Sequence, residues 1–288
     1  MQTTLWVTLL FGLHSAWVSA AGYWFQKPHN IRPLISQIRP DSVLLKWGVF
    51  STNGHVKPTE DIGNMEAACR NKIPLVAWIS HRLSQNEQLL PEAGQRLGTE
   101  LNQLLAAPCF QGVELDIEPL PEPPPWLAPF LKQLRKVLNA HFKLRLAIPP
   151  VSDTKLPGLS WLPTRALAIA SECDGLDLMV YDTGLTKAFE YERLVQKSLA
   201  FARVFFERYP DKTLLLGLPA YKEKTKLHWP MVENLLTASQ ALEDSGADKS
   251  LICSKQLSIA FYAGWTIDIK DRPLALRIEK WRANACKG

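Results

Sequence analysis

Short apolar runs rich in β-forming residues alternate with longer stretches of helical period along nearly the whole chain after residue 20. This alternation is typical of a parallel sheet covered by helices, because two parallel strands need a long crossover between them. Strands are predicted at Gly22–Phe25, Val43–Phe50, Ile73–Ile79, Gly112–Ile117, Lys143–Ile148, Gly175–Tyr181, Thr213–Leu218 and Leu257–Tyr262. Helices, with apolar residues at spacings of three and four, are predicted at Glu92–Ala106, Trp126–His141, Ala188–Tyr209 and Met231–Leu242.

Eight strand-and-helix units without a break in composition favour one domain over two. The predicted fold class is therefore α/β, as a single (β/α)8 TIM barrel over residues 21–288 rather than a doubly wound sheet with a second domain. The segment between Tyr221 and Leu257 has room for a loop and one helix. No large insertion is expected between the seventh and eighth predicted strands.

The composition is that of an ordinary globular protein. Of the 288 residues 47% are hydrophobic and 21% are charged, which is enough apolar material for a full core. The formal net charge is +5, and Lys and Arg are scattered, so there is no basic stripe for a nucleic-acid backbone. Nucleic acid is therefore not expected as a partner, and we expect a monomer.

Residues 1–20 have the pattern of a secretory signal peptide. An apolar run from Leu5 to Leu13 is followed by small residues that end in Val18-Ser19-Ala20, so cleavage is predicted after Ala20. The run carries no Lys or Arg before it and is shorter than the roughly 20 apolar residues that span a bilayer. Export to the periplasm or the exterior is predicted, with an uncleaved anchor as the open alternative, and no later stretch is predicted to span a membrane.

Five cysteines are present, at Cys69, Cys109, Cys173, Cys253 and Cys286. None stands in a CxxC pair, which argues against a zinc site. Export would allow disulfides, and the odd number leaves at least one thiol unpaired, but the sequence does not give the connectivity. No metal and no cofactor are expected.

The most informative segment is the fourth predicted strand, where acidic and apolar residues alternate. Side chains alternate across a strand, so Glu114, Asp116 and Glu118 share one face and the intervening apolar residues share the other. In a barrel the acidic face points inward, where like charges within about 7 Å repel one another and at least one proton is retained. A carboxyl that stays protonated is what a general acid needs to protonate a departing glycosidic oxygen.

Two other interpretations of the three acids stay open. A solvated acidic face on an amphipathic strand would need no function, although a central barrel strand has no solvated face and burying three carboxylates costs several kcal/mol. A divalent-metal site is the second, but matching acids are absent from the ends of the third and fifth predicted strands.

Four segments, in order, resemble the strand signatures of the family 18 glycoside hydrolases. Gln111–Glu118 reads Q-G-V-E-L-D-I-E and is similar to the D-G-x-D-x-D-x-E of that family's fourth strand. Ala147-Ile148-Pro149-Pro150 resembles the end of its fifth strand, Leu178–Asp182 its M-x-Y-D, and Leu216–Tyr221 its G-x-P-x-Y. This chain departs from the pattern at Gln111 and at Glu114, where the family has Asp.

The resemblance implies a substrate-assisted glycosidase without a separate protein nucleophile. Glu118 would be the acid/base, and Asp116 would orient the 2-acetamido group whose carbonyl oxygen attacks the anomeric carbon. Tyr181 would hydrogen-bond that acetamido group, with Asp182 beside it. The substrates implied are N-acetylhexosamine polymers of chitin or cell-wall type.

Further substrate-binding residues are predicted around these catalytic ones. Flat aromatic rings stack on the apolar faces of sugars, and Trp24, Trp78 and Trp265 lie at or beyond strand ends, as do Trp47 and Trp229. For any single one of them, packing in the core or at the rim is the more common role. The predicted substrate-binding set is Glu114, Asp182, Tyr221, Trp265, Trp24 and Trp78. Pro119–Pro125 is predicted to be a stiff loop that walls one side of the cleft. Asp174 and Asp177 are interpreted as capping or turn residues.

Two functions of different classes follow. The first is an exported hydrolase that cleaves N-acetylhexosamine glycans with retention of configuration, favoured by Glu118, Asp116 and Tyr181. The second is a catalytically inactive barrel that binds a glycan or an envelope partner, favoured by Glu114 in place of Asp. Which glycan, and endo or exo action, stay open.

Overall fold

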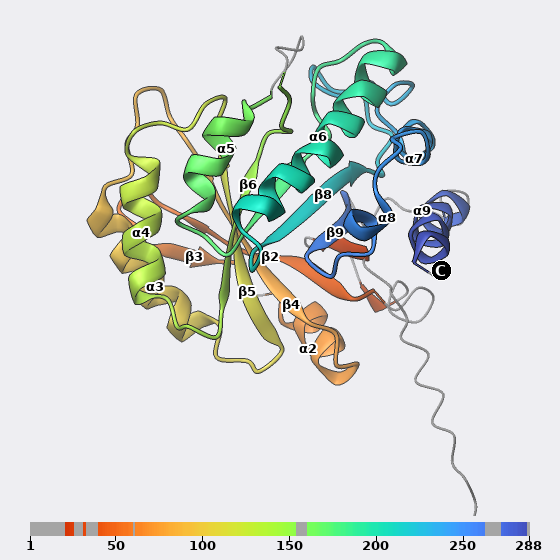
Figure 1. Ribbon diagram of the computed structural model, residues 1–288. Helices are drawn as coiled ribbons and strands as arrows, with labels where there is room; N and C mark the ends of the chain where they lie inside the picture. The colour runs from red at the N-terminus through yellow and green to blue at the C-terminus, as the bar shows by residue number, and fades with distance from the viewer. Residues whose placement is uncertain are drawn as a thin grey trace, which may run out of the picture.

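The computed structural model describes residues 21–25, 31–32, 40–59, 61–153, 160–262 and 272–286. In it the strands lie together at the centre of the molecule and the helices lie outside them (Figure 1). The predicted α/β class is confirmed. The predicted signal peptide at residues 1–20 lies outside the described residues.

Each of the eight predicted strands overlaps a strand of the structure. These are β1 (Ala21–Phe25), β2 (Ser42–Phe50), β4 (Leu75–Arg82), β5 (Phe110–Glu118), β6 (Lys143–Ile148), β7 (Gly175–Met179), β8 (Thr213–Pro219) and β9 (Leu257–Tyr262). A ninth strand that was not predicted, β3 (Val56–Pro58), pairs with β2 in the antiparallel direction. It extends the sheet beyond the repeating units.

The eight predicted strands are parallel and pair in a continuous order. From β1 the neighbours are β9, β8, β7, β6, β5, β4 and β2, and β1 also pairs with β2. Each of the eight strands therefore pairs with a neighbour on both sides, and the last strand in the order, β2, pairs with the first, β1. Because all eight strands are parallel, their carboxyl ends lie at the same edge of the sheet.

The helices are α2 (Ile62–Arg70), α3 (Pro91–Leu104), α4 (Leu127–Val137), α5 (Pro163–Ala170), α6 (Ala188–Arg208), α7 (Leu235–Glu243), α8 (Lys249–Ile252) and α9 (Arg272–Ala285). All four predicted helices are present, and α3 and α6 match their predicted bounds closely. Between β8 and β9 the chain forms α7 and α8 and no strand. None of the helices in the described ranges is long and apolar enough to cross a membrane.

Two helices are shorter than predicted, for identifiable reasons. The prediction ended one at His141, but α4 ends at Val137 because Leu138 is extended, and the Arg135 guanidinium donates to the carbonyls of Leu138 and Asn139. The prediction began the other at Met231, but α7 begins after Asn234, whose side chain accepts from the Thr237 N–H. Asn is a preferred N-cap residue, so it fixes the start of the helix.

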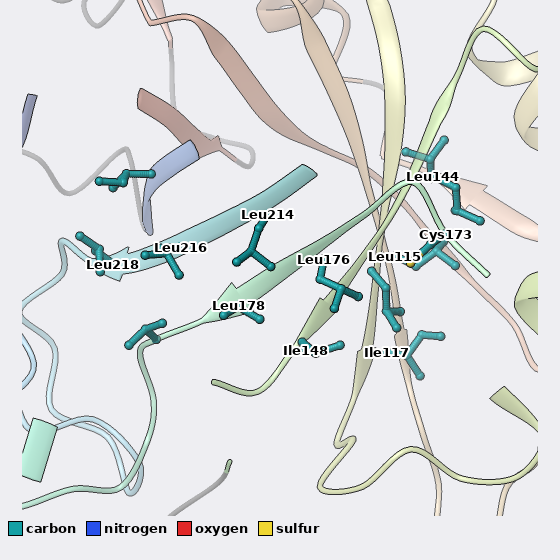
Figure 2. Close-up of a cluster of buried hydrophobic side chains, with 14 of the residues drawn as sticks. Leu115, Ile117, Leu144, Ile148, Cys173, Leu176, Leu178, Leu214, Leu216 and Leu218 are labelled. Carbon is teal, nitrogen blue, oxygen red and sulfur yellow. The ribbon is translucent and has the colours of Figure 1, made fainter. Parts of the chain in front are cut away.

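The core has two parts, one on each side of the strands. The larger part lies between strands and helices and includes alternate residues of one strand, Leu214, Leu216 and Leu218 of β8 (Figure 2). The smaller part is a separate cluster of Trp24, Leu44, Trp78, Leu215 and Ala260, contributed by β1, β2, β4, β8 and β9. Residues of β8 thus alternate between the two parts, which gives the sheet an apolar face toward the helices and a second, inner face.

Two disulfides join distant parts of the chain. Cys69 is bonded to Cys109 and Cys253 to Cys286, while Cys173 is a buried free thiol. The first bond links the end of α2 to the segment before β5, and the second links α8 to the end of α9. The expectation that an odd cysteine count leaves one thiol unpaired is confirmed.

Candidate active site

The alternation of β5 places its acidic residues on the inner face. Leu115 and Ile117 belong to the apolar layer under the helices (Figure 2). The indole of Trp24, on β1, donates to Glu114, and the indole of Trp78, on β4, donates to Asp116. These partners belong to the inner apolar cluster, so the predicted inward register of the acidic face is confirmed.

Glu114 is the deepest of the three acids. It is buried, its Oε1 accepts from Trp24 Nε1 at 3.0 Å, and its Oε2 has no hydrogen-bond partner among the described residues. Burial and the adjacent Asp177 carboxylate raise the pKa of Glu114 well above its ordinary value. Burial and the neighbouring Asp177 therefore favour the neutral form of Glu114 over the charged one.

Asp177 takes part in this inner network, so its interpretation as a capping or turn residue was wrong. It lies inside β7, is completely buried, and accepts from Arg145 Nε of β6 at 2.8 and 3.0 Å. A buried carboxylate needs a partner of opposite charge. The Arg145 guanidinium supplies that charge beneath the cleft.

Asp116 lies one layer above Glu114 and is also buried. Its Oδ2 accepts from Trp78 Nε1 at 2.9 Å, and its Oδ1 has no hydrogen-bond partner in the described part of the chain. Burial raises the pKa of Asp116, while the charge of Lys46 and the bond from Trp78 act in the opposite direction. Asp116 therefore keeps one buried hydrogen-bond acceptor that the described residues leave unsatisfied.

Glu118, at the end of β5, is the exposed member of the set. Partial burial of its carboxyl in the cleft, together with the negative charges of Asp116 and Asp182, raises the pKa of Glu118 to about 7. Lys46 and Arg82 oppose this rise. A carboxyl with this pKa carries a proton in a large part of the molecules at neutral pH and can act as a general acid.

A cleft of about 600 Å³ opens above the acidic strand. Its lining comes from the carboxyl ends of the parallel strands and the loops that follow them, including Ser80, His81 and Arg82 after β4, Pro149 and Pro150 after β6, and Tyr262 of β9. Pro119 and Leu120 also line it, so the predicted wall of Pro119–Pro125 reaches the cleft with its first two residues. Such edges are where parallel α/β enzymes hold their catalytic residues.

Aromatic rings form the floor of the cleft. Tyr181 and Tyr262 stack with ring centroids 4.4 Å apart, and Trp24 meets both rings edge-on from below. Trp78, Tyr181 and Tyr262 line the cleft. Burial raises the pKa of Tyr181 well above its ordinary value, so its hydroxyl keeps the proton that it would donate to a ligand.

Tyr221 and Asp182 are joined by a hydrogen bond from the tyrosine hydroxyl to Asp182 Oδ1, at 2.5 Å. Burial raises the pKa of Asp182, and the bond from Tyr221 limits the rise. Asp182 lines the cleft and has a positive φ of 52°. Tyr221 is buried behind Asp182, so it supports the cleft instead of lining it.

A buried histidine–glutamate pair ties the two loops that carry these residues. His228 Nδ1 lies 3.2 Å from Glu233 Oε2, and neither side chain is exposed. Glu233 Oε1 accepts from the backbone N–H of Thr183 at 3.0 Å, and the ring of His228 stacks on Tyr221. The loop after β8 is thereby fastened to the loop after β7.

The structure brings most of the predicted site residues together. Asp116, Glu118, Tyr181, Asp182 and Trp78 line one cleft. Glu114, Trp24 and Tyr221 lie beneath or behind it as supports, and Trp265 lies outside the described residues. Of the other tryptophans, Trp47 packs against Phe110 in the outer core, whereas Trp229 is partly exposed beneath the Lys224 ammonium.

Several participants were not among the site residues predicted from the sequence. Lys46 and Arg82 line the cleft, Arg145 and Asp177 carry the charge beneath it, and His228 with Glu233 holds its loops. The one available signal was the strand alternation, which puts Lys46 on the same face of β2 as Leu44. Within the described ranges no cluster of three or more His, Cys, Asp or Glu could hold a metal.

Gly217 of β8 leaves the space that the aromatic floor occupies. A Cβ at this position would lie 2.8 Å from Trp24 Cη2 and 3.0 Å from Tyr181 Cε1. Gly217→Ala is therefore expected to displace both rings and to lower the free energy of unfolding, measured by urea denaturation, by about 1–3 kcal/mol. Gly63→Ala is the matched control, because a Cβ there meets nothing within 4 Å. Equal stability of the two variants would show that the rings of Trp24 and Tyr181 can accommodate the added methyl group.

Comparison with solved structures relates this arrangement to known folds. The chain is similar to a chitinase from Chromobacterium violaceum, with a TM-score of 0.54 and 14% identity over 94% of this chain and 99% of that one. It is similar to the GH18 chitinase ChiB of Flavobacterium johnsoniae, with a TM-score of 0.57 and 14% identity over 92% and 94%. The chain has the fold of the family 18 chitinases.

The same fold is found in a bacterial enzyme that lyses the spore cortex. The chain is similar to SleL of Bacillus cereus, with a TM-score of 0.59 and 13% identity, over 90% of this chain and 74% of that one. No family profile matches the chain, and no curated protein matches it in sequence. The chain therefore has a chitinase-like fold and a sequence that has diverged from those of the known chitinases.

Proposed function

We propose that this chain is a retaining glycoside hydrolase of N-acetylhexosamine glycans, built on a single (β/α)8 barrel. The observation that carries the proposal is Glu118, a carboxyl with a pKa of about 7 at the mouth of a cleft, directly above buried Asp116 on the same strand. Solved structures of the same fold include chitinases and a cortex-lytic enzyme, which supports glycan hydrolysis as the reaction class.

In the proposed first step the substrate supplies its own nucleophile. The carbonyl oxygen of the 2-acetamido group bonds to the anomeric carbon while the bond from that carbon to the glycosidic oxygen breaks. Glu118 gives its proton to the departing oxygen. The unpaired Oδ1 of Asp116 would accept the acetamido N–H, and the Tyr181 hydroxyl would donate to the acetamido oxygen.

In the second step Glu118 acts as a base. It removes a proton from a water molecule whose oxygen bonds to the anomeric carbon, and the acetamido oxygen leaves with its bonding pair. The sugar regains its hydroxyl with the original configuration, because two displacements have occurred at one carbon. Glu118 is again protonated for the next cycle.

The shape of the cleft supports an oligo- or polysaccharide substrate. It is open at the edge of the sheet, with stacked tyrosines as its floor and Trp78 beside them. Between β8 and β9 the chain adds only α7, α8 and their loops. We expect a shallow groove that admits a chain of sugars instead of a deep tunnel.

Export to the periplasm or the exterior is part of the proposal. The Cys69–Cys109 and Cys253–Cys286 disulfides support it, because disulfides persist mainly in oxidising compartments. The signal-like pattern of residues 1–20 agrees with this location.

A second candidate function is a barrel that binds glycan without cleaving it. Glu114 favours it, since this glutamate stands where the family 18 strand motif has aspartate. Its carboxyl accepts a hydrogen bond from Trp24 and lies beside Asp177. An immobilised acid beneath Asp116 would restrict the rearrangement of the Asp116 side chain during the reaction.

The two functions are separated by one assay with three substrates of matched length. The purified protein is incubated with chitooligosaccharides, muropeptide glycans and cellooligosaccharides, and the products are followed by NMR. Hydrolysis of a substrate with acetamido groups, with the β-anomer formed first, is expected, and cellooligosaccharides should stay intact. Cleavage of cellooligosaccharides at the same rate would contradict the substrate-assisted step, and binding without cleavage would establish the second function.

The activity is expected to fall as pH rises through about 7. Glu118 donates a proton in the first step, so only its protonated form in the free enzyme is active, and kcat/KM reports the pKa of the free enzyme. The measurement is kcat/KM for a chitooligosaccharide between pH 5 and 9, with stability followed by circular dichroism. A rate that increases from pH 7 to 9 would exclude Glu118 as the proton donor.

A further inference from the structure

Lys46 is a cation beside the acidic residues of β5 in the cleft. It lies on β2, is directly paired in register with Trp78 of β4, and lines the cleft. Its ammonium lies 4.0 Å from the centroid of the Trp78 ring, a cation–π contact. No carboxylate of the described residues lies within salt-bridge distance of it.

The same indole also holds Asp116. Trp78 takes the Lys46 ammonium on its face and donates its Nε1–H to Asp116 Oδ2 at 2.9 Å. One rigid ring therefore fixes the cation and the carboxylate relative to each other. The remaining oxygen of Asp116, Oδ1, is buried and has no hydrogen-bond partner in the described ranges, so its capacity to accept a hydrogen bond is unused in the free protein.

The cleft that Lys46 lines holds further charged and titratable groups. They are Asp116 and Glu118 on β5, His81 and Arg82 at the end of β4, Tyr181 and Asp182 after β7, and Tyr262 on β9, with the buried Glu114 of β5 beneath them. Burial lowers the pKa of Lys46, whereas the three acids of β5 oppose that change, with Asp116 the strongest of them. Lys46 in turn acts to lower the pKa of both Asp116 and Glu118.

We propose that Lys46, seated on Trp78, is the fixed positive charge that keeps Asp116 ionised while Glu118 carries the proton. Lys46 is then a positioning residue: it acts through Asp116 and donates nothing to the substrate. Its role in turnover rests on the proposed hydrolase function, but its effect on Asp116 is a property of the free protein.

The need for such a charge follows from burial. Asp116 is 8% exposed and receives one hydrogen bond, which is little compensation for a carboxylate removed from water. Without a nearby cation the buried Asp116 would compete with Glu118 for the single proton. A proton on Asp116 would block the oxygen that accepts the acetamido N–H and would remove it from the general acid.

The test compares Lys46→Met, Lys46→Gln and Lys46→Arg in the full chain, with Lys57→Met as the matched control on the exposed strand β3. The Asp116 carboxyl is labelled with carbon-13, assigned by its loss in Asp116→Asn, and titrated by NMR. Its midpoint is expected to rise by about one pH unit or more in the methionine and glutamine variants. It should stay near that of the parent in the arginine and Lys57 variants.

A second readout concerns turnover. The acid limb of kcat/KM for a chitooligosaccharide should move to higher pH with the Asp116 midpoint in Lys46→Met and should be restored in Lys46→Arg. An unchanged Asp116 midpoint in folded Lys46→Met and Lys46→Gln overturns the proposal. A raised midpoint in a protein that cleaves no glycan supports the role of Lys46 and refutes the proposed hydrolase function instead, so the two failures are distinguishable.

Discussion

Replacing Glu118 with glutamine is expected to lower kcat for a chitooligosaccharide by about 10²–10⁴-fold, the range that a positioned general acid contributes. Glutamine has nearly the same shape but no proton to give to the departing oxygen. Because Glu118 is exposed at the end of β5, the change leaves no buried group without a partner. Substrate affinity should therefore be retained, and the loss should appear in kcat and not in KM.

The matched control for this variant is Glu207→Gln, the same change on the exposed face of α6. Turnover is measured by product release, affinity by calorimetry with a chitooligosaccharide, and folding by thermal denaturation. Equal turnover by Glu118→Gln and the parent would end the assignment of Glu118. A drop of equal size in Glu207→Gln would show that the loss arises from general destabilisation.

The strands could be predicted from sequence because their signal is local and repeated. In β5 the alternation of Leu115 and Ile117 with Glu114 and Asp116 specified both the strand and the face of each side chain. Helix ends were less predictable, since they depend on single contacts such as the Asn234 cap of α7. The short β3 was missed because it is held by pairing with β2 and not by a pattern of its own.

The acids of the site could be predicted, but the groups that set their charges could not. Glu118 and Asp116 stand two residues apart on one strand, so the sequence shows them together. Lys46 lies on another strand and is linked to Asp116 by the ring of Trp78, which contacts both side chains. No local sequence pattern indicates a contact between residues so far apart in the chain. The same holds for Asp177, because its position near the start of a strand indicates a turn residue and its partner Arg145 lies on another strand.

The loop network escaped prediction for a further reason. His228 and Glu233 are close in sequence, yet their effect depends on Thr183 and Tyr221, which arrive from other loops. Polar residues in loops are most often solvated, so nothing in the local sequence indicates that this pair is buried. The strand motifs of the site can thus be recognised in the sequence, whereas the buried polar residues that support them can be recognised only in the structure.

Replacing Arg145 with methionine is expected to lower the free energy of unfolding by about 3–5 kcal/mol, as for a buried ion pair that loses one partner. Asp177 is completely buried and receives at least two hydrogen bonds from this guanidinium. Without Arg145, the Asp177 carboxylate would remain in the interior beside Glu114 with no counter-charge. The change is measured by urea denaturation at pH 7.

The control is Arg70→Met, which removes an exposed arginine paired with Glu66 on α2 and should change stability by less than about 1 kcal/mol. The double variant Arg145→Met with Asp177→Leu removes both buried charges and should recover much of the loss, because apolar groups of similar volume can replace a buried pair. If the double variant is no more stable than Arg145→Met alone, the penalty comes from lost packing and not from an unpaired charge. Recovery would show that the loss in Arg145→Met comes from the unpaired charge of Asp177 in the interior beneath the cleft.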